Sequence, residues 1–192
     1  MEININCDLG EKSKLHSNDR DPELLEIVNS ANIACGYHAG NEQTMDEVIK
    51  ISKINQVSIG AHPSFNDPEN FGRERMNLSS LQIKKLIFDQ YEILQKIAVM
   101  HGENVTHIKP HGALNNMACE DLELADVLAS SIKDISKEYK ILDSSYPIDL
   151  VVGGPPCQGF SNIGHRRSYN VNKKDLAGNH LYKYMAKITS IN

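Results

Sequence analysis

Along the first three quarters of the chain, short apolar runs alternate with longer stretches in which apolar positions recur at helical spacing. The short runs predict four strands, at residues 2–7, 33–34, 57–59 and 105–108. The clearest helical stripe runs from Ile83 to Ala98 and follows Ser79-x-x-Gln82, the pattern of a capping box. Repeated β-then-α units predict a parallel sheet, because parallel neighbours need crossover connections. Either a (β/α) barrel or a doubly wound sheet satisfies this pattern.

Two aspartates mark the starts of further helices. Asp21 precedes Pro22, and we expect it to be the capping residue of a helix. Asp121 precedes a stripe that includes Leu128 and Ile135, and it predicts a second capped helix.

A titratable side chain follows each predicted strand. These are Asp8, His38, His62 and His111, which lie among glycines and other small residues. Because the carboxyl ends of parallel strands lie side by side, we expect the four groups to converge. One carboxylate with two or three imidazoles can hold a divalent metal such as zinc or manganese, with Asp8, His38 and His62 as its ligands. The same groups could equally shuttle protons.

Four further residues are candidates for the same site. Glu11 lies in the loop after the first strand, and Lys109 ends an apolar strand, where its ammonium can stabilise an oxyanion. The alternative for Lys109 is a surface side chain whose stem covers apolar atoms. We expect Asn32 and Arg73 to bind substrate. Arg73 lies in a loop long enough for a lid or clamp, although an exposed structural loop would look the same.

Composition restricts the class of protein. The 192 residues are 40% hydrophobic, which is globular, and contain no apolar run as long as a membrane span. The N-terminus lacks the basic and apolar regions of a signal peptide. The four cysteines form no CxxC pair, which fits a reduced protein better than a disulfide framework. We therefore expect a cytoplasmic protein with no membrane contact.

The net charge of −5 is unevenly divided. Residues 1–145 carry 14 Lys and Arg against 23 Asp and Glu, a balance of −9, whereas residues 146–192 carry 6 against 2, a balance of +4. An acidic body with a basic tail indicates two parts of different origin, unless the asymmetry is a random fluctuation.

The second part begins near Tyr146. Residues 148–152 predict a fifth strand, and the glycine-rich and proline-rich segment 153–161 follows it. Cys157 comes directly after two prolines, on a rigid turn that suits an exposed nucleophile, although a buried and inert cysteine is the alternative. Nothing matches GxxxxGK[ST], so the chain shows no phosphate loop of its own for ATP.

Residues 1–142 resemble the LamB/YcsF family, the A subunits of bacterial 5-oxoprolinase. Five motifs carry the resemblance in order: residues 6–11, 30–40, 60–64, 71–73 and 109–114. The resemblance implies a distorted (β/α) barrel of the polysaccharide deacetylase-like type. It also implies that the part matched here lacks the family's C-terminal strands, so we expect a truncated barrel. The missing strands leave a non-catalytic fusion relic or subunit-binding module as the alternative to an enzyme.

The same resemblance implies an activity and its partners. The family opens 5-oxoproline, a small lactam, to L-glutamate with ATP that is handled together with the B and C subunits. It implies catalytic roles for Asp8, Glu11, Lys109 and His111, and substrate-binding roles for Asn32, His38, His62 and Arg73.

Residues 146–192 resemble a cytosine-C5 DNA methyltransferase around its catalytic loop, and so imply a partial Rossmann-like segment. The segment 153–161 carries that family's Pro-Cys-Gln core, in which Cys157 would attack a flipped cytosine and S-adenosylmethionine would be the cofactor. The family's glycine-rich cofactor motif and Glu-Asn-Val motif are absent, so we expect no methylation. We expect at most weak, salt-sensitive contacts with nucleic-acid phosphates. The basic residues available for these are Arg166, Arg167, Lys173 and Lys174.

Overall fold

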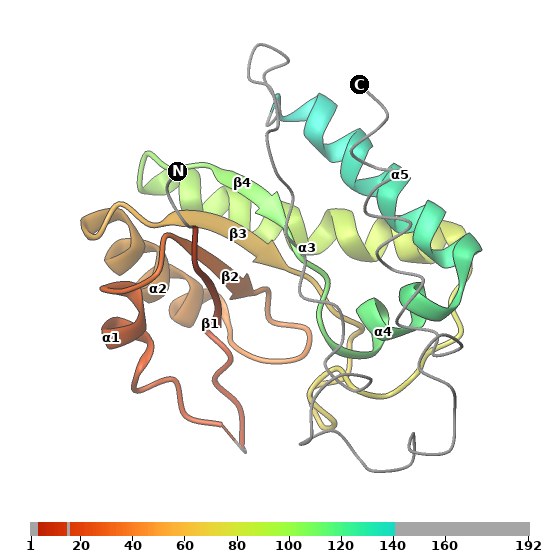
Figure 1. Cartoon of the computed structure of the whole chain (residues 1–192), viewed down its shortest axis with the longest axis horizontal. Helices are drawn as coiled ribbons and strands as arrows, with labels where there is room; N and C mark the ends of the chain where they lie inside the picture. The colour runs from red at the N-terminus through yellow and green to blue at the C-terminus, as the bar shows by residue number, and fades with distance from the viewer. Residues whose placement is uncertain (1–3, 15, 141–192) are drawn as a thin grey trace.

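The computed structural model describes residues 4–14 and 16–140, which form an α/β unit around one parallel sheet (Figure 1). Its strands are β1 (Asn6–Leu9), β2 (Ser30–Ala34), β3 (Ser58–His62) and β4 (Val105–Ile108). Its helices are α1 (Asp21–Leu25), α2 (Glu42–Ile54), α3 (Ser80–Met100), α4 (Gly112–Glu120) and α5 (Leu122–Glu138). The predicted β-then-α alternation and the parallel sheet are confirmed.

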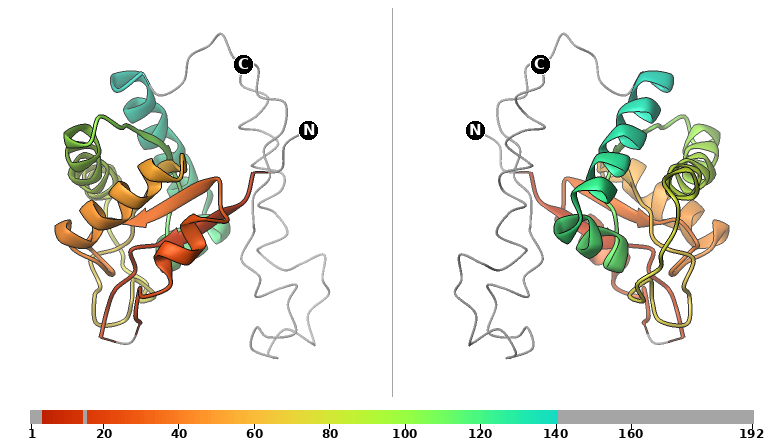
Figure 2. Two further views of the ribbon diagram at one scale, coloured as in Figure 1. Left: turned by 90° about the vertical axis from the view of Figure 1, so that its left-hand side faces the viewer. Right: turned by 90° about the vertical axis from the view of Figure 1, so that its right-hand side faces the viewer.

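The strands are ordered β1-β2-β3-β4, so each strand pairs with the next one along the chain. Helices α2 and α3 pack against each other and against strands β2, β3 and β4, and α5 packs on α3 (Figure 2). A strand order without reversal is typical of consecutive barrel units, whereas a doubly wound sheet reverses direction at a switch point. Within the described residues the sheet is open, and its closure into a barrel stays a prediction.

The two faces of the sheet differ in chemistry. The face toward the helices contributes Leu9, Ile33, Ile59 and Val105 to the apolar core. Side chains point alternately to opposite faces along a strand, so the intervening residues of β1, β2 and β3 share the other face. A register shift between Ile59 and Gly60 in the pairing of β3 with β4 brings His107 to that face as well. That face is polar and cross-linked by hydrogen bonds among Asn4, Asn6, Asp8, Ser30, Asn32, Ser58 and His107.

The helix signals in the sequence are mostly confirmed. Ser79 and Gln82 form the capping box at the start of α3, whose buried stripe includes Ile83, Ile87 and Leu94. The carboxylate of Asp121 accepts hydrogen bonds from backbone N–H groups at the start of α5. Helix α4 was not predicted, because its first turn has no side-chain cap.

Two expectations near the N-terminus are wrong. Among the described residues the first strand is Asn6–Leu9, so Asn4 and Ile5 precede it, whereas residues 2 and 3 of the predicted range 2–7 lie outside the described part. The strand ends later than predicted because its pairing with β2 extends through Leu9. Asp21 is not the capping residue of α1; Arg20 holds that position, and the Asp21 carboxylate accepts a hydrogen bond from the backbone N–H of Gly10 at 2.7 Å. Asp21 therefore fixes the loop after β1 rather than the helix start.

No helix in the described ranges 4–14 and 16–140 is long and apolar enough to cross a membrane. The predicted fifth strand, Cys157 and the whole methyltransferase-like segment lie outside the described residues.

Candidate functional site

Six of the predicted site residues meet at the carboxyl edge of the sheet. Asp8 lies in β1, His62 ends β3, and the other four lie in the loops that follow β1, β2 and β4: Glu11, His38, Lys109 and His111. Asp8 was expected just past its strand, but it lies within it. The expected convergence is therefore confirmed for these residues, by the contacts described below.

Glycines let two of these loops approach each other. Gly40, with φ of 73°, donates its backbone N–H to the carbonyl of Lys12 at 2.8 Å. A Cβ at Gly40 would lie 2.5 Å from the carbonyl oxygen of Gly10, which is closer than van der Waals contact allows. The loop with Glu11 can therefore lie directly against the loop with His38.

The loop after His62 is anchored from two sides. Buried Gln90 of α3 accepts a hydrogen bond from the backbone N–H of Ser64 at 2.9 Å and donates one to its carbonyl at 2.8 Å. Gly72, with φ of 66°, accepts a hydrogen bond from Ala113 of α4 through its carbonyl, and a Cβ at Gly72 would overlap Ser64. These contacts place Phe71 against the histidines.

Asp8 and Lys109 form an ion pair. The Lys109 ammonium lies 2.6 and 2.8 Å from the two carboxylate oxygens of Asp8. The buried amide of Asn32 donates a further hydrogen bond to Asp8 Oδ1 at 2.8 Å. Burial by itself would raise the pKa of Asp8, but hydrogen bonds and positive charge from His62 and Lys109 outweigh it and hold the pKa well below its usual range. Asp8 is therefore ionised at neutral pH.

Glu11 lies at the centre of the three histidines. Its Oε1 is 3.2 Å from His38 Nε2, 3.2 Å from His111 Nδ1 and 3.8 Å from His62 Nε2. Burial opposes ionisation, but the hydrogen bonds from His111 and His38 lower the pKa of Glu11 to about 2. Burial, followed by the neighbouring His111 and His62, lowers the pKa of His38 to about 4 despite its hydrogen bond to Glu11.

The hydrogen bonds of His62 and His111 determine where their protons lie. His62 Nδ1 lies 2.5 Å from the carbonyl oxygen of Lys109, and His111 Nε2 lies 3.0 Å from that of Phe71. A carbonyl oxygen only accepts, so these two nitrogens carry the hydrogens in the neutral rings. The remaining nitrogens, His62 Nε2 and His111 Nδ1, face each other 3.0 Å apart, and each also faces a carboxylate: His62 Nε2 that of Asp8 and His111 Nδ1 that of Glu11. A positive species here, either a proton gained by one imidazole or a metal cation, would interact favourably with both nitrogens and with the carboxylates.

The site contains a group that fits a metal ion. Ligand atoms of Glu11, His38 and His111 all lie within 4.8 Å of one another. This group shares only His38 with the set expected from the sequence, which was Asp8, His38 and His62. His38 differs from the other two histidines, because its Nδ1 is buried and has no hydrogen-bond partner among the described residues. A ligating histidine usually donates its second N–H to a carbonyl or carboxylate, as His62 and His111 do here.

Arg73 lies at the margin of the cluster. Its guanidinium carbon is 5.3 Å from the centre of the Phe71 ring, and that ring packs edge-on against His38 and His111. Arg73 is exposed and forms no ion pair with another residue of the described part of the chain. It is therefore a positive charge close to the site and available to a ligand.

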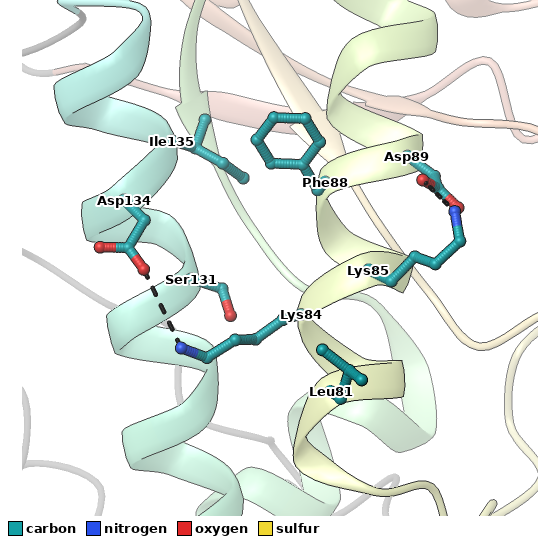
Figure 3. A pocket seen from close by; sticks show the side chains of 8 residues that line it. All are labelled: Leu81, Lys84, Lys85, Phe88, Asp89, Ser131, Asp134 and Ile135. Carbon is teal, nitrogen blue, oxygen red and sulfur yellow. Dashed lines mark hydrogen bonds and ion pairs between the residues drawn. The ribbon is translucent and has the colours of Figure 1, made fainter.

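A surface groove of about 300 Å³ lies elsewhere, between helices α3 and α5 (Figure 3). Its lining combines an apolar floor with two ion pairs, Lys84–Asp134 and Lys85–Asp89. It contains none of the clustered site residues; its lining consists of Leu81, Lys84, Lys85, Phe88, Asp89, Ser131, Asp134 and Ile135.

Sequence reasoning missed two polar residues behind the site, Gln90 and His107. Gln90 lies in the buried stripe of α3, where a polar residue among apolar ones was the available signal. His107 lies in β4 on the same face as Asn32, and its alignment with that residue depends on strand register.

A parallel α/β sheet with acids and histidines gathered at the strand carboxyl ends is the layout of an α/β enzyme or ligand-binding domain. The family model of the LamB/YcsF family matches residues 3–147, which include every member of the cluster. The chain belongs to the LamB/YcsF family.

Its relatives agree with this assignment. A protein of Nitrobacter hamburgensis, named as the A subunit of 5-oxoprolinase, is 44% identical over 139 residues, covering 72% of this chain and 54% of the relative. One of Staphylococcus aureus (strain Newman) with the same name is 40% identical over 150 residues, covering 77% and 60%. The crystal structure of a lactam utilization protein from Thermus thermophilus matches with a TM-score of 0.67 and 36% identity, covering 70% of this chain and 55% of the other. The chain thus spans between half and two thirds of the length of these relatives.

A second family model, that of the C-5 cytosine-specific DNA methylases, matches residues 115–191. The match overlaps α4 and α5 and then extends beyond the described residues. It includes Cys157, about whose surroundings the structure makes no statement.

Proposed function

We propose that the chain acts in the ATP-dependent hydrolysis of 5-oxoproline to L-glutamate, together with B and C partner subunits that bring the ATP. The observation that carries the proposal is that His62 Nε2 lies 3.5 Å from Asp8 Oδ2 and 3.8 Å from Glu11 Oε1, and so joins the Asp8–Lys109 pair to the Glu11–histidine cluster. All of these residues lie within the region that matches the LamB/YcsF family. The names of the two relatives and of the Thermus structure support the choice of a lactam as substrate.

The chemistry of a five-membered lactam explains the need for these groups. Amide resonance stabilises the ring, so opening it requires an activated carbonyl and a positioned water. The Lys109 ammonium, held by Asp8, is placed to stabilise negative charge on the lactam oxygen. Water adds to the carbonyl carbon, and the cluster around Glu11 receives its proton. The ring C–N bond then breaks, and that proton passes to the leaving nitrogen, which becomes the amino group of glutamate.

The substrate also carries a carboxylate that needs a partner. Arg73 is the candidate, because it is exposed, lies beside Phe71 at the edge of the cluster and has no ion pair among the described residues. Guanidinium groups bind carboxylates through two parallel hydrogen bonds. Arg73 would therefore orient the ring, while Asn32 would act through Asp8.

We also propose that the cluster binds a divalent metal ion. The nitrogens of His62 and His111 that face each other, together with ionised Glu11, form a donor set that suits zinc or manganese once the two rings are neutral. Both histidines have the carbonyl partner on the second nitrogen that metal ligands usually have. A bound cation would polarise the carbonyl and acidify a water. The rival is a proton shared by the two imidazoles.

Glutamate release by the chain with its B and C partners, ATP and 5-oxoproline tests the activity. We expect His111→Ala and Lys109→Met each to reduce the rate at least about 100-fold, because each removes a group that contacts the reacting atoms. His101→Ala, which removes a histidine bound to Asp46 on the helical side, is the matched control. Release that is unaffected by His38→Ala and His111→Ala would refute the assignment.

We also propose how the chain is divided into two parts and where in the cell it acts. We place a LamB/YcsF-like domain, the first part of a (β/α) barrel, at residues 1–142 and a methyltransferase-derived segment at residues 146–192. The strand order, in which each strand pairs with the next one along the chain, supports the first assignment. The match to the methylase family model supports the second. We propose a cytoplasmic location, because the sequence favours reduced cysteines.

Cytosine methylation is the second candidate function, and the methylase match favours it. Cys157 would be the nucleophile and S-adenosylmethionine the methyl donor. We expect no methyl transfer, because the chain lacks that family's cofactor motif. Incubation with DNA and labelled S-adenosylmethionine decides: label on cytosine that disappears in Cys157→Ser would establish the second function.

A further inference from the structure

One row of residues crosses the whole sheet beneath the site. Asp8 of β1 faces Asn32 of β2, Asn32 faces Gly60 of β3, and Gly60 faces His107 of β4. Facing residues in paired strands project from the same side of the sheet. The three side chains therefore share the polar face, and Gly60 leaves a gap between two of them.

The gap at Gly60 lets His107 reach across a strand. His107 Nε2 lies 3.1 Å from Asn32 Oδ1, although β2 and β4 are separated by β3. Strands in a sheet are about 4.8 Å apart, so a side chain that contacts the next strand but one must pass over the strand between. A Cβ at Gly60 would overlap the imidazole of His107. The hydrogen bond thus depends on the absence of a side chain at this position.

The direction of each hydrogen bond in the row follows from chemistry. The ionised Asp8 carboxylate only accepts, so the Asn32 atom beside it must be the amide nitrogen, at 2.8 Å. The second hydrogen of that nitrogen is donated to Asn6 Oδ1 at 2.9 Å. Both donors of Asn32 are then used, and its oxygen faces His107. His107 must donate from Nε2, which assigns its tautomer.

We propose that His107 is a positioning residue for Asp8. It holds the amide of Asn32 in the one orientation that donates to Asp8, and Asp8 in turn holds the Lys109 ammonium. His107 is half-buried behind this chain of contacts and does not itself belong to the cluster around Glu11. Its catalytic consequence rests on the proposed lactam hydrolysis, whereas the hydrogen bond itself does not.

Two substitutions separate positioning from packing. His107→Gln keeps an N–H donor that can reach Asn32, whereas His107→Leu fills similar space without one. We expect His107→Leu to lower kcat for glutamate release about tenfold or more, with KM for 5-oxoproline within about threefold, because small displacements of catalytic groups are costly. His107→Gln should stay within about threefold of the wild type. His101→Leu, at another half-buried histidine, should leave both constants unchanged.

The proposal is overturned if His107→Leu retains the wild-type kcat. It is also overturned if His107→Gln and His107→Leu lose kcat equally and lower the melting temperature equally, which is the signature of packing alone.

A spectroscopic measurement tests the hydrogen bond without any turnover. Two-bond 15N–1H correlation spectra of the full chain should show His107 as the Nε2–H tautomer. The Nε2 proton itself should exchange slowly with solvent, and it should become fast-exchanging in Asn32→Ala. An Nδ1–H tautomer in the wild type, or proton exchange that is unaffected by Asn32→Ala, would refute the hydrogen bond from His107 to Asn32. If the wild type releases no glutamate with its partners, the proposed function is wrong, and this spectrum still decides the role of His107 toward Asn32.

Discussion

Gln90 offers the sharpest test of how the site is supported from the helical layer. It is completely buried in α3, and its side-chain amide bonds both the N–H and the carbonyl of Ser64, two residues after His62. Ser64 is also fully buried. Leucine at position 90 has a similar size but cannot bond either group. Gln90→Leu therefore leaves two backbone polar groups buried without these partners.

The size of the effect follows from these contacts. An unsatisfied buried donor or acceptor costs about 1–3 kcal/mol, so the two groups of Ser64 together cost about 2–6 kcal/mol. The extra apolar surface that leucine buries offsets about 1–2 kcal/mol. We expect the free energy of unfolding to fall by about 3 kcal/mol.

Urea denaturation at neutral pH, followed by circular dichroism, measures the change. The control is Gln43→Leu on α2, an exposed glutamine that bonds Glu47 at 3.0 Å, which should alter stability by less than about 0.5 kcal/mol. A Gln90→Leu protein as stable as this control, with an unchanged m value, would show that the anchor at Ser64 carries no stability, and our reasoning would be refuted.

Three further predictions concern the loops and the cluster. Gly40→Ala should destabilise the protein by about 2 kcal/mol more than Gly102→Ala in urea titrations; both have φ of 73°, but only Gly40 lies against a backbone carbonyl, and equal losses would contradict this. In chelator-treated protein, His38, whose pKa falls from 6.5 to about 4 on folding, should contribute stability fully above pH 6.5 and lose about 3 kcal/mol as the pH falls toward 4. A His38→Gln variant with the same acid profile in urea titrations would exclude that contribution. Elemental analysis of protein purified without added metal or chelator should find about one equivalent of divalent metal, retained in His101→Ala and lost in His62→Ala. Less than about a tenth of an equivalent in the wild type, with no thermal shift on adding zinc or manganese, would exclude the metal and leave a proton as the positive species between His62 and His111.

The sequence by itself was sufficient for the alternation of strands and helices, apart from α4, and for the gathering of the site. Apolar periodicity is local, so the stripe of α3 and its capping box could be read directly. Convergence of Asp8, His38, His62 and His111 followed from a general property of parallel sheets, whose carboxyl ends share one edge. Neither inference required knowledge of a distance.

Only the tertiary structure decided which groups touch. Glu11 was one candidate among several in the sequence, yet it lies between three histidines because Gly40 lets two loops meet. His107 reaches Asn32 because a register shift between β3 and β4 pairs His107, rather than Thr106, with Gly60. Register, loop approach and proton position depend on residues distant in the chain, and therefore no local pattern could specify them.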